Sequence, residues 1–468
     1  MKGEKIMAKY DIAIIGGGPG GYVAAIRAAQ LGAKVCVVEK DEVLGGTCLN
    51  RGCIPTKAIL HSAKMHRNLI SAAKFGISAS GISLDYRKVI SRKDQIVNRL
   101  TNGIKFLFKT NAIEIIKGKA KIVSSGAIGI TDGSQQSEVE AGNIIIATGS
   151  EPMKLSDIST DGEIIQTSKE ILSCDNLPES ILIIGAGAIG CEFADIFNSL
   201  GVKVRLVEMM DHILPEEDDE IASKLESIFK KRGIEVFTQT KVNKVEKRDS
   251  SSNVYLSGDK TFEVDRVLVA VGRSSNISEI GLEKNQIKLD KNKISVNEYM
   301  QTNIPHIYAI GDITPGPMLA HVASKEGTVA VEHIMGMNSK MDYKVVPSCV
   351  YTDPEVAGVG LTEQKAKENH EIKIGRFPLM ASGKAMCIEE IEGLIKIIAD
   401  KDTDEILGVR MIAPHATELI AECVLAMKTE CTYTELAETI HAHPTISEAV
   451  MEAAADIDNM AISLPKKP

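Results

Sequence analysis

The sequence lacks long apolar runs and has few aromatic residues. Aromatic residues make up 4% of its 468 positions, beside 44% hydrophobic and 25% charged residues, which is typical of an ordinary soluble α/β protein. No apolar stretch approaches the roughly 20 residues that span a bilayer. Residues 1–9 contain neither the apolar core of a secretory signal nor an arginine-rich transit segment. We therefore expect a cytoplasmic protein with no membrane partner.

Clustered basic residues are also missing. The chain has 54 Lys and Arg against 63 Asp and Glu, a formal charge of -9. Binding of nucleic acid depends on grouped Lys and Arg side chains that neutralise phosphates. The charge balance therefore disfavours nucleic acid as a partner.

The cysteines do not form the pattern of a secreted disulfide framework. There are nine, an odd number scattered over a long chain. Only Cys48 and Cys53 have a spacing and a setting that suggest chemistry. The others are predicted to be free thiols, most of them buried packing residues: Cys36, Cys174, Cys191, Cys349, Cys387, Cys423 and Cys431.

What the sequence does contain is a dinucleotide-binding unit near its start. An apolar strand at residues 11–15 leads into Gly-x-Gly-x-x-Gly at residues 16–21, a helix comes next, and a second strand ends at Glu39. In this order the glycines bring backbone N–H groups close to a pyrophosphate at a helix N-terminus, and the acid accepts hydrogen bonds from a ribose.

The same unit occurs a second time. Its glycine motif spans residues 185–190, and its second strand leads into Glu208. Gly16 and Glu39 are 23 positions apart, as are Gly185 and Glu208. One glycine motif is weak evidence, but two complete units with matched spacing are strong. Two nucleotide-binding domains therefore lie in tandem.

Other segments fit around these units. Residues 124–137 and 249–253 are predicted to be hairpin excursions, and the apolar strand at residues 307–312 is predicted to return to the first sheet. From about Val346 strands mix with helices and no further nucleotide motif is present. We predict an α/β fold with two tandem Rossmann-like domains and a C-terminal α+β domain. The expected segments are 1–150 and 274–345 for the first domain, 151–273 for the second and 346–468 for the third.

Cys48 and Cys53, separated by four residues, come after the first unit. A thiol pair beside two dinucleotide sites suggests that electrons pass between a nicotinamide, a flavin and a disulfide. Pro55 suits the first turn of a helix, so Cys53 should lie near a helix N-terminus that favours thiolate. Cys48, on a preceding loop, should be the more accessible sulfur. The alternatives are two unpaired thiols or half of a metal site, for which no second ligand pair at zinc spacing is present.

Two charged residues lie close to these motifs. Lys57 is four residues after Cys53 and shares its helix face, where a cation could stabilise thiolate or reduced flavin. Its alternative is a solvated surface charge. Glu192 lies on the opening turn after the second glycine motif, where an acid is ordinary.

Near the C-terminus, His441 or His443 could form an acid–base pair with Glu448. A carboxylate can fix the tautomer of a histidine and raise its basicity, as removal of a thiol proton requires. Thr445 or Ser447 is a candidate cap for the helix that begins there. A metal site or a structural histidine is the alternative, and the spacing does not choose between the two histidines.

The coenzyme can be predicted from charge. Glu208 favours a free ribose 2′-hydroxyl, and Met209, Met210 and Asp211 supply no arginine for a 2′-phosphate. NAD is therefore predicted over NADP.

At these residues the chain resembles the flavin-dependent pyridine nucleotide-disulfide oxidoreductases, and among them those that oxidise dihydrolipoyl groups. The most specific stretches are residues 45–57, 185–192, 308–312, 318–321, 347–363 and 441–448. The resemblance implies tightly bound, non-covalent FAD and NAD+/NADH. Electrons would pass from protein-bound dihydrolipoamide through a Cys48–Cys53 disulfide and FAD to NAD+.

The same resemblance implies roles for single residues. Cys53 matches the sulfur next to the flavin, Cys48 the sulfur that attacks substrate, and His443 with Glu448 the catalytic base and its partner. Lys57 and Glu192 match a pair beside the flavin. Implied FAD residues are Gly16, Gly18, Gly21, Glu39, Gly46, Thr47, Lys57, Ala120, Thr148, Gly149, Ser150, Asp312, Met318, Leu319, Ala320 and His321. Implied NAD residues are Gly185, Gly187, Gly190, Glu192, Glu208, Val242 and Gly272.

Partners are implied in the same way. Residues 346–468 match a dimer interface, and the histidine of one subunit would serve the cysteine pair of the other. The dithiol would arrive on lipoyl-bearing carrier proteins of 2-oxoacid dehydrogenase or glycine cleavage complexes. A glutathione-type reductase would carry basic residues after Glu208, and a mercury reductase would carry a C-terminal cysteine pair, which residues 456–468 lack. A flavin-bound scaffold or redox sensor is the alternative from another class.

Overall fold

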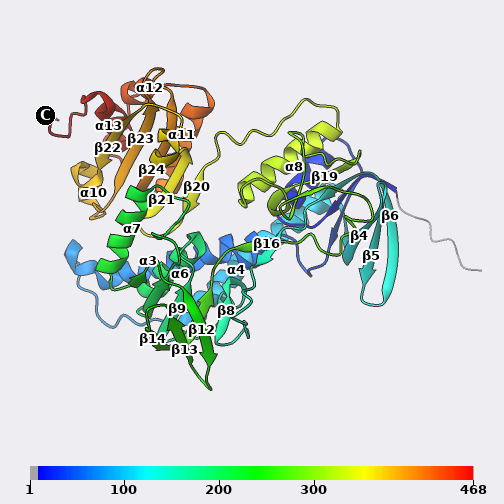
Figure 1. Cartoon of the computed structure of the whole chain (residues 1–468), viewed down its shortest axis with the longest axis horizontal. Coiled ribbons are helices and arrows are strands. Elements are labelled where there is room, and N and C mark those ends of the chain that lie inside the picture. The colour runs from blue at the N-terminus through cyan, green and yellow to red at the C-terminus, as the bar shows by residue number, and fades with distance from the viewer. Residues whose placement is uncertain (1–8, 467–468) are drawn as a thin grey trace, which may run out of the picture. The chain divides into compact units, whose positions relative to one another are not determined.

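The computed structural model describes residues 9–466, and its contacts group into two units (Figure 1). The first unit combines the chain up to Ala58 with Lys88–Met153 and Arg273–Tyr343. The second unit combines Ile59–Arg87 and Lys154–Gly272 with the chain from Lys344 onward. Within residues 9–466, no helix has both the length and the apolar character needed to cross a membrane.

A parallel sheet forms the centre of the first unit. Its strands are ordered β3-β2-β1-β6-β19, where β6 also carries an antiparallel extension. Strand β2 is buried along its whole length because parallel strands are covered on both faces. The predicted return to this sheet is confirmed, since Ile307 pairs with Ile144. The strand bounds are β1 (Lys9–Ile15), β2 (Val35–Glu39), β3 (Glu114–Lys117), β6 (Gln135–Ile146) and β19 (Ile307–Ala309).

The predicted hairpin excursion in this unit is present as a three-stranded meander. β4 (Lys119–Ser124) and β5 (Ala127–Asp132) pair antiparallel, and β5 pairs with the first half of β6. Short strands complete the unit: β7 (Ser150–Pro152) with β16 (Arg273–Ser275), and β17 (Leu289–Asp290) with β18 (Lys293–Ile294).

Helices α1 (Pro19–Gln30) and α8 (Ala320–Ile334) pack closely in the first unit. A Cβ atom added to Gly327 would lie 2.7 Å from the Gly20 carbonyl oxygen, so small residues set this approach. The other helical segments of the N-terminal part are α2 (Gly46–Arg51), α3 (Cys53–Ile70), η1 (Ala72–Phe75) and α4 (Tyr86–Thr110), and η2 (Gly311–Ile313) comes after β19.

The second unit repeats the arrangement with a parallel sheet ordered β11-β10-β9-β15-β8 and a meander of β12, β13 and β14. The meander confirms the second predicted excursion. The strands are β8 (Ile165–Thr167), β9 (Ser180–Ile184), β10 (Lys203–Val207), β11 (Glu235–Phe237), β12 (Val242–Lys247), β13 (Ser252–Leu256), β14 (Thr261–Val264) and β15 (Arg266–Val269). The helices are α5 (Ser168–Ile171), α6 (Ala188–Ser199) and α7 (Asp219–Lys231).

The C-terminal part of the second unit is an antiparallel sheet with helices, as predicted. Its order is β20-β21-β24-β23-β22, and every residue of β24 is buried. The strands are β20 (Ser348–Val350), β21 (Glu355–Gly360), β22 (Ile372–Pro378), β23 (Leu394–Asp400) and β24 (Ile406–Ala413). The helices are α9 (Glu363–Lys367), η3 (Leu379–Ala381), α10 (Gly383–Cys387), α11 (Ala416–Lys428), α12 (Tyr433–Glu438), α13 (Glu448–Ala455) and η4 (Asp456–Asp458).

All nine cysteines are free thiols in the structure. The prediction that most of the seven outside the pair are buried is wrong. Cys36, Cys191 and Cys423 are buried because β2, α6 and α11 turn them toward the cores. The remaining four keep contact with solvent: Cys174, Cys387 and Cys431 lie in loops or at a helix end, and Cys349 lies in β20.

Candidate active site

Both glycine motifs have the same backbone geometry at their first and third glycines. A Cβ atom on Gly21 would lie 1.9 Å from the Gly16 carbonyl oxygen, and one on Gly190 would lie 1.9 Å from the Gly185 carbonyl oxygen. Gly16 and Gly185 have φ angles of +105° and +95°, which L side chains rarely adopt. The tight strand-to-helix turn therefore explains these four glycines without any ligand.

The middle glycines are not explained in this way. Gly18 and Gly187 have φ angles of -73° and -70°, which suit any residue. A Cβ atom on Gly187 would meet nothing within 4 Å, and one on Gly18 would meet only the Gly46 Cα atom, at 3.8 Å. Each is the N-cap of its helix and makes no side-chain cap. An open space at a helix N-terminus fits a pyrophosphate group, whose close approach requires glycine.

In both units, the acid at the end of the second strand accepts a hydrogen bond from a backbone N–H of the glycine turn. Glu39 Oε2 accepts a hydrogen bond of 2.7 Å from the Gly17 N–H, and Glu208 Oε2 accepts one of 2.7 Å from the Ala186 N–H. The other carboxylate oxygen of Glu208 accepts from the Met210 N–H at 2.9 Å. Both side chains are buried. Each carboxylate is thus fixed beside its glycine turn, where it can accept from ribose hydroxyls.

The second unit places the remaining predicted nucleotide residues at or near the same sheet. Val242 is the first residue of β12, and Gly272, at φ +116°, comes after the carboxyl end of β15. The side chains after Glu208, Met209 and Met210, are exposed and uncharged. This edge offers no arginine beside Glu208 to bind a 2′-phosphate.

Several predicted residues of the first unit meet at the carboxyl edge of its parallel sheet. Thr148 and Gly149 come after β6, and Asp312 lies in η2 after β19. The Ser150 hydroxyl donates a hydrogen bond to Asp312, and the Thr148 hydroxyl donates to the Asn276 carbonyl oxygen at 2.7 Å. Ligands of such sheets bind at this edge. Elsewhere in the unit, Ala120 lies on β4, Met318 and Leu319 directly precede α8, and Ala320 and His321 begin it.

Arg273 belongs to this edge and was missed from the sequence. Its Nε donates to the Ser150 hydroxyl at 2.7 Å and its Nη2 donates to the Ser150 carbonyl oxygen at 2.6 Å. Burial lowers the pKa of Arg273, while the nearby charges of Asp312 and Cys53 act in the opposite direction. The only sequence signal is a basic residue directly after Gly272. A partly buried guanidinium therefore adds positive charge beside the cysteines.

The cysteine-bearing segment is attached to the first glycine motif. The Gly45 N–H donates to the Gly17 carbonyl oxygen at 2.8 Å. Gly45 and Gly46 have φ angles of +109° and +56°, and a Cβ atom on Gly46 would lie 2.7 Å from the Gly18 Cα atom. This turn leads directly into α2. The segment that carries both cysteines therefore begins beside the candidate pyrophosphate site.

Cys48 and Cys53 lie together, with two predicted features wrong. Cys53 is the first residue of α3, as predicted, but Cys48 lies within the short helix α2 and not on a loop. Cys48 is half-buried and Cys53 is exposed, the reverse of the predicted order, because α2 turns Cys48 inward against Cys53. A hydrogen bond with Cys53 and burial raise the pKa of Cys48, and the Lys57 ammonium opposes this. The Lys57 charge thus acts on the thiol pair.

Glu192 is more than an acid at the start of a helix. Its side chain is buried in α6, and its Oε1 accepts a hydrogen bond of 3.0 Å from the Tyr351 N–H. This partner is 159 residues away in the sequence. The contact joins the helix of the second glycine motif to the segment before β21.

The structure distinguishes the two C-terminal histidines. His441 is held at both ring nitrogens, by the Thr439 carbonyl oxygen at 2.8 Å and by Glu422 at 2.8 Å. His443 Nδ1 lies 2.8 Å from Glu448 Oε1, and its side chain is 80% exposed. Among residues 9–466, nothing hydrogen-bonds to Nε2 of His443. Only His443 combines an oriented ring with an available nitrogen.

Glu448 is fixed at the start of α13. Its second oxygen accepts from the Thr445 N–H at 2.8 Å. This hydrogen bond, together with the smaller effect of the contact with His443, lowers the pKa of Glu448. Ser447 occupies the predicted N-cap position, but its hydroxyl makes no capping bond because it lies 2.8 Å from the Thr445 hydroxyl. The pair is therefore a charged carboxylate and an imidazole.

A metal site does not emerge from the part of the chain that the structure describes. Within residues 9–466, no three or more His, Cys, Asp and Glu side chains are grouped so that they could hold an ion. The two cysteines contact each other, and both histidines are held by the protein groups described above. We therefore assign no metal ligand.

Comparison with known proteins covers most of the chain. The family model described as pyridine nucleotide-disulphide oxidoreductase matches residues 10–327, and the model for the dimerisation domain of that family matches residues 346–454. The dihydrolipoyl dehydrogenase of Bacillus subtilis is 46% identical over 97% of this chain and 99% of its own. The mitochondrial dihydrolipoyl dehydrogenase of Pisum sativum is 44% identical over 95% of this chain and 90% of its own. The solved structure of LpdA from Mycobacterium tuberculosis is 30% identical, with a TM-score of 0.89 over 96% of this chain and 99% of that one. The chain belongs to the pyridine nucleotide-disulphide oxidoreductase family.

Proposed function

We propose that this chain is a dihydrolipoyl dehydrogenase, which oxidises protein-bound dihydrolipoamide to lipoamide and reduces NAD+. The observation that carries the proposal is the thiol pair Cys48 and Cys53, attached to a dinucleotide turn. Full-length relatives with this name, 41% to 46% identical, support the choice of substrate.

The first unit would hold FAD. Its glycine turn and the N-terminus of α1 suit a pyrophosphate, Glu39 suits a ribose, and Asp312 and Arg273 lie at the same sheet edge. When bound, FAD would accept the electron pair of the reduced cysteines and pass it to NAD+. The other residues proposed for this site are Gly46, Thr47, Lys57, Ala120, Thr148, Gly149, Ser150, Met318, Leu319, Ala320 and His321.

The second unit would hold NAD+ in the corresponding way. The open space beside Gly187 suits the pyrophosphate, and the buried Glu208 carboxylate suits unmodified ribose hydroxyls. The proposed NAD residues are Gly185, Gly187, Gly190, Glu192, Glu208, Val242 and Gly272.

The thiol chemistry would run through both sulfurs in their oxidised, disulfide-bonded form. One thiolate of the dihydrolipoyl group attacks Cys48, and the S–S bond breaks with its electron pair going to Cys53. The second substrate thiolate then displaces Cys48 from the mixed disulfide, which closes the lipoyl ring. The substrate loses two electrons and two protons, and the cysteines gain the two electrons. The helix N-terminus at Cys53 and the Lys57 charge favour the resulting thiolate.

His443 would take a proton from the substrate thiol. Its ring is oriented through Nδ1 by Glu448, so Nε2 is the basic atom. His441 is unsuited to this role because both its nitrogens have protein partners.

The proposed working form is a homodimer. Residues 346–454 match a dimerisation domain, and apolar side chains of this region are exposed in the single chain, with Ile440 beside the histidines 96% exposed. Such side chains are expected at an interface. We propose that the FAD domain is built from residues 1–150 and 274–345, the NAD domain from 151–273 and the interface domain from 346–468. His443 of one subunit would serve Cys48 of the other.

The physiological dithiol would be carried by a lipoyl-bearing protein of a 2-oxoacid dehydrogenase or glycine cleavage complex. The proposed activity leads to this partner, because a lipoyl group reduced in such a complex must be reoxidised before the next cycle. The acidic net charge of -9 does not favour a nucleic-acid partner.

The test is substitution of each cysteine in the holoenzyme. Cys53→Ser and Cys48→Ser should each lower dihydrolipoamide oxidation with NAD+ by at least about 10³-fold, because neither can form the disulfide. Cys387→Ser is the matched control, since Cys387 is an exposed thiol outside the pair. Cys53→Ser should also remove the long-wavelength absorption of a thiolate next to oxidised flavin.

Two results would contradict the proposal. Retained dihydrolipoamide oxidation in both variants would exclude the disulfide as the electron carrier. A wild-type preference for oxidised glutathione with NADPH would overturn the substrate and leave the fold intact.

A further inference from the structure

Glu326 is a buried acid that the proposed reaction does not use. It lies on α8 and is 1% exposed. A carboxylate in such a position is costly unless hydrogen bonds replace its lost water. Donors from three residues outside α8 supply these hydrogen bonds, and all of them belong to the first unit. The partners of this side chain therefore indicate its role.

The first donor is the N–H of Gly311, the residue that begins η2. It donates to Glu326 Oε2 at 2.5 Å, across 15 positions of the sequence. Gly311 has a φ angle of +75°, and a Cβ atom there would lie 3.3 Å from the Cβ atom of Ala323, which is also on α8. Helix α8 thus fixes Gly311 by a hydrogen bond and by close packing.

The other two donors lie at the second carboxylate oxygen, Oε1. The Tyr343 hydroxyl donates at 2.5 Å and the Thr314 hydroxyl at 3.4 Å. Gly316 leaves no room for a side chain beside them, because its Cβ atom would lie 2.8 Å from Tyr343 Cε1 and 2.9 Å from Glu326 Oε1. The segment from Gly311 to Gly316 is therefore packed around one carboxylate.

This segment carries a residue of the proposed FAD site. Asp312 comes directly after Gly311, and its carboxylate accepts a hydrogen bond from the Ser150 hydroxyl. The Asp312 carbonyl oxygen accepts from the Ser275 hydroxyl at 2.7 Å. Asp312 is therefore held by the sheet edge through its own oxygens, and Glu326 holds the residue before it.

The charges around Glu326 favour a carboxylate and not an amide. Burial raises the pKa of Glu326 and the Asp312 charge acts in the same direction, whereas the hydrogen bonds from Tyr343 and Gly311 lower it. Lys293 is near both acids, since its ammonium donates to the Asp312 carbonyl oxygen and both acids raise its pKa against the larger effect of burial. A carboxylate accepts at both oxygens, but an amide would turn an NH₂ group toward these donors.

We propose that Glu326 is a positioning residue of the FAD site, which fixes Gly311 so that Asp312 meets the flavin nucleotide in one orientation. The inference rests on the proposed function, because it requires that the first unit binds FAD. Groups that contact a cofactor are effective when their neighbours hold their geometry. Through its hydrogen bonds, Glu326 joins α8 to η2 and to Tyr343, the last residue of the unit.

The test is the FAD affinity of the full-length holoenzyme, measured from the flavin retained after dilution and ultrafiltration. Glu326→Gln keeps the side-chain volume and should raise the dissociation constant of FAD about tenfold or more. Tyr343→Phe should raise it about threefold, because one donor of the set is lost. Gly316→Ala should also raise it, since the methyl group would overlap Tyr343 and Glu326. With FAD saturating, the KM for NAD+ should be unchanged in all three variants.

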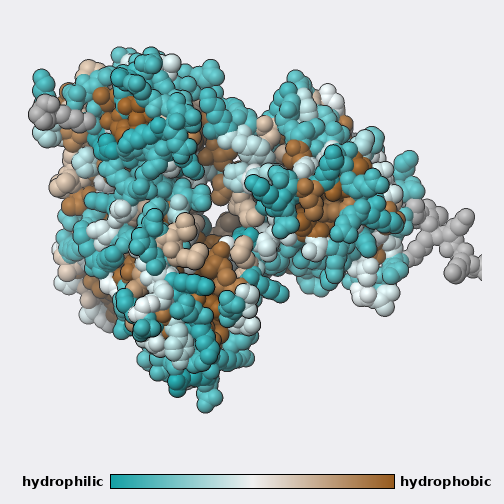
Figure 2. Space-filling view, in the orientation of Figure 1, coloured by the Kyte–Doolittle hydropathy of each residue, from teal (hydrophilic) through white to brown (hydrophobic). Residues whose placement is uncertain are grey.

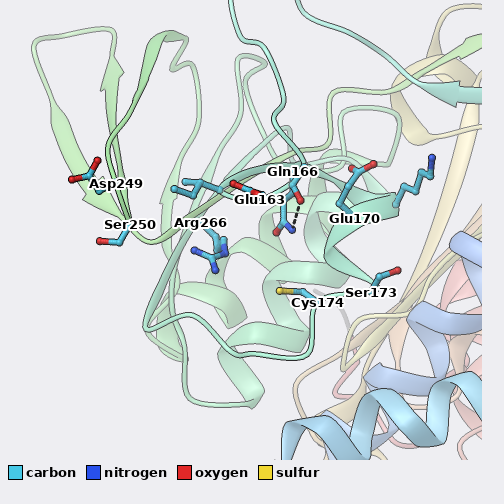
Figure 3. A pocket seen from close by; sticks show the side chains of 11 residues that line it. Glu163, Gln166, Glu170, Ser173, Cys174, Asp249, Ser250 and Arg266 are labelled. Atoms are coloured by element: carbon cyan, nitrogen blue, oxygen red, sulfur yellow. Dashed lines mark hydrogen bonds between the residues drawn. The ribbon is translucent and has the colours of Figure 1, made fainter.

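Two glutamates provide matched controls. Glu332, on the same helix, accepts from the Arg27 Nε and Nη2 atoms of α1 at 3.0 Å and 2.6 Å. Glu170, in the second unit, accepts from the Thr167 N–H at 2.9 Å at the wall of a pocket (Figure 3). Glu332→Gln and Glu170→Gln each remove a hydrogen-bonded carboxylate, and both should leave the FAD affinity unchanged even where thermal stability falls.

A spectroscopic measurement separates positioning from a general loss of stability. The visible circular dichroism of bound flavin depends on its asymmetric surroundings. In FAD-saturated protein it should change in Glu326→Gln and match the wild type in Glu332→Gln. An unchanged spectrum in Glu326→Gln would show that the residue stabilises the fold without orienting the site.

Other results would also overturn the proposal. Unchanged FAD affinity in Glu326→Gln would do so, as would an equal loss in Glu332→Gln, which would assign the effect to α8 as a whole. If Glu326→Gln does not fold, unchanged FAD affinity in both Tyr343→Phe and Gly316→Ala would overturn it. A wild-type protein that binds no FAD would overturn the proposed function as well, whereas FAD binding that is insensitive to these substitutions would overturn only the role of Glu326.

Discussion

The two glycine motifs are alike in backbone geometry, but the segments downstream of them differ. Gly21 and Gly190 lie equally close to the preceding turns, and Glu39 and Glu208 accept backbone hydrogen bonds of equal length. After β2, however, the chain turns at Gly45 into the cysteine helix. After β10 it continues into exposed methionines. In the proposed function, the repeated part of the fold binds the nucleotides, and the parts present once carry out the reaction.

The surface of the molecule also has a feature that occurs only once. Hydrophilic side chains cover most of the face seen in Figure 2, with apolar patches between them. The exposed apolar side chains include several from the C-terminal region, most of them within the match to the dimerisation domain: Met380, Met386, Leu425, Ile440 and Ile462. Both the cysteine pair and this region occur once, outside the duplicated motifs.

Among the predictions that follow, the largest effect is expected at a residue that neither glycine motif supplies. His443→Gln should lower kcat for dihydrolipoamide oxidation by about 10² to 10⁴-fold, because the proposed base is lost. Both nucleotides should still bind, as measured by flavin absorbance and NADH titration. His441→Gln is the matched control and should mainly lower thermal stability, since it breaks two hydrogen bonds of a buried ring. Equal loss of kcat in the two variants would contradict the choice of His443.

The pH profile tests the partner of the same histidine. The pKa of Glu448 is lowered, so the carboxylate is charged at neutral and mildly acidic pH and its stabilising contribution is lost only as pH falls through that lowered value. A charged carboxylate favours the protonated imidazole. Glu448→Gln should therefore move the histidine limb of log kcat/KM toward lower pH. An unmoved limb would show that Glu448 does not act on the titrating group.

The comparison between motifs is tested by matched glycine substitutions. Gly21→Ala should cause loss of FAD, and Gly190→Ala should raise the KM for NAD+ by about 100-fold with FAD content unchanged, because each methyl group would overlap a carbonyl oxygen. Gly187→Ala has room in the protein. It should leave the melting temperature unchanged and still weaken NAD+ binding about tenfold. Normal NAD+ binding in Gly187→Ala would contradict the proposed pyrophosphate position.

The smallest effect is expected when each acid is neutralised. Glu208→Gln should raise the KM for NAD+ by about tenfold or less, since an amide keeps one acceptor for the backbone or the ribose. Glu39→Gln should weaken FAD retention similarly and leave the KM for NAD+ unchanged. Weaker FAD retention in Glu208→Gln, or a raised KM for NAD+ in Glu39→Gln, would show that the two units do not act separately.

Local pattern predicted most of the fold. The strand–turn–helix units, the two meanders and the return of β19 depend on short-range periodicity and on glycine spacing, and each was predicted within a few residues. The relative exposure of Cys48 and Cys53 was not predicted correctly. Whether Cys48 or Cys53 faces solvent depends on how α2 packs, and a sequence with two similar thiols does not contain that information.

By itself, the sequence determined the duplicated nucleotide units, the position of Cys53 at a helix start and the acids that end the second strands. These features are set by residues close to one another in the chain. Only the tertiary structure decided which histidine has an available nitrogen and that Arg273 lies beside the cysteines. Each of these depends on how separate segments pack, and that packing requires the folded sheets.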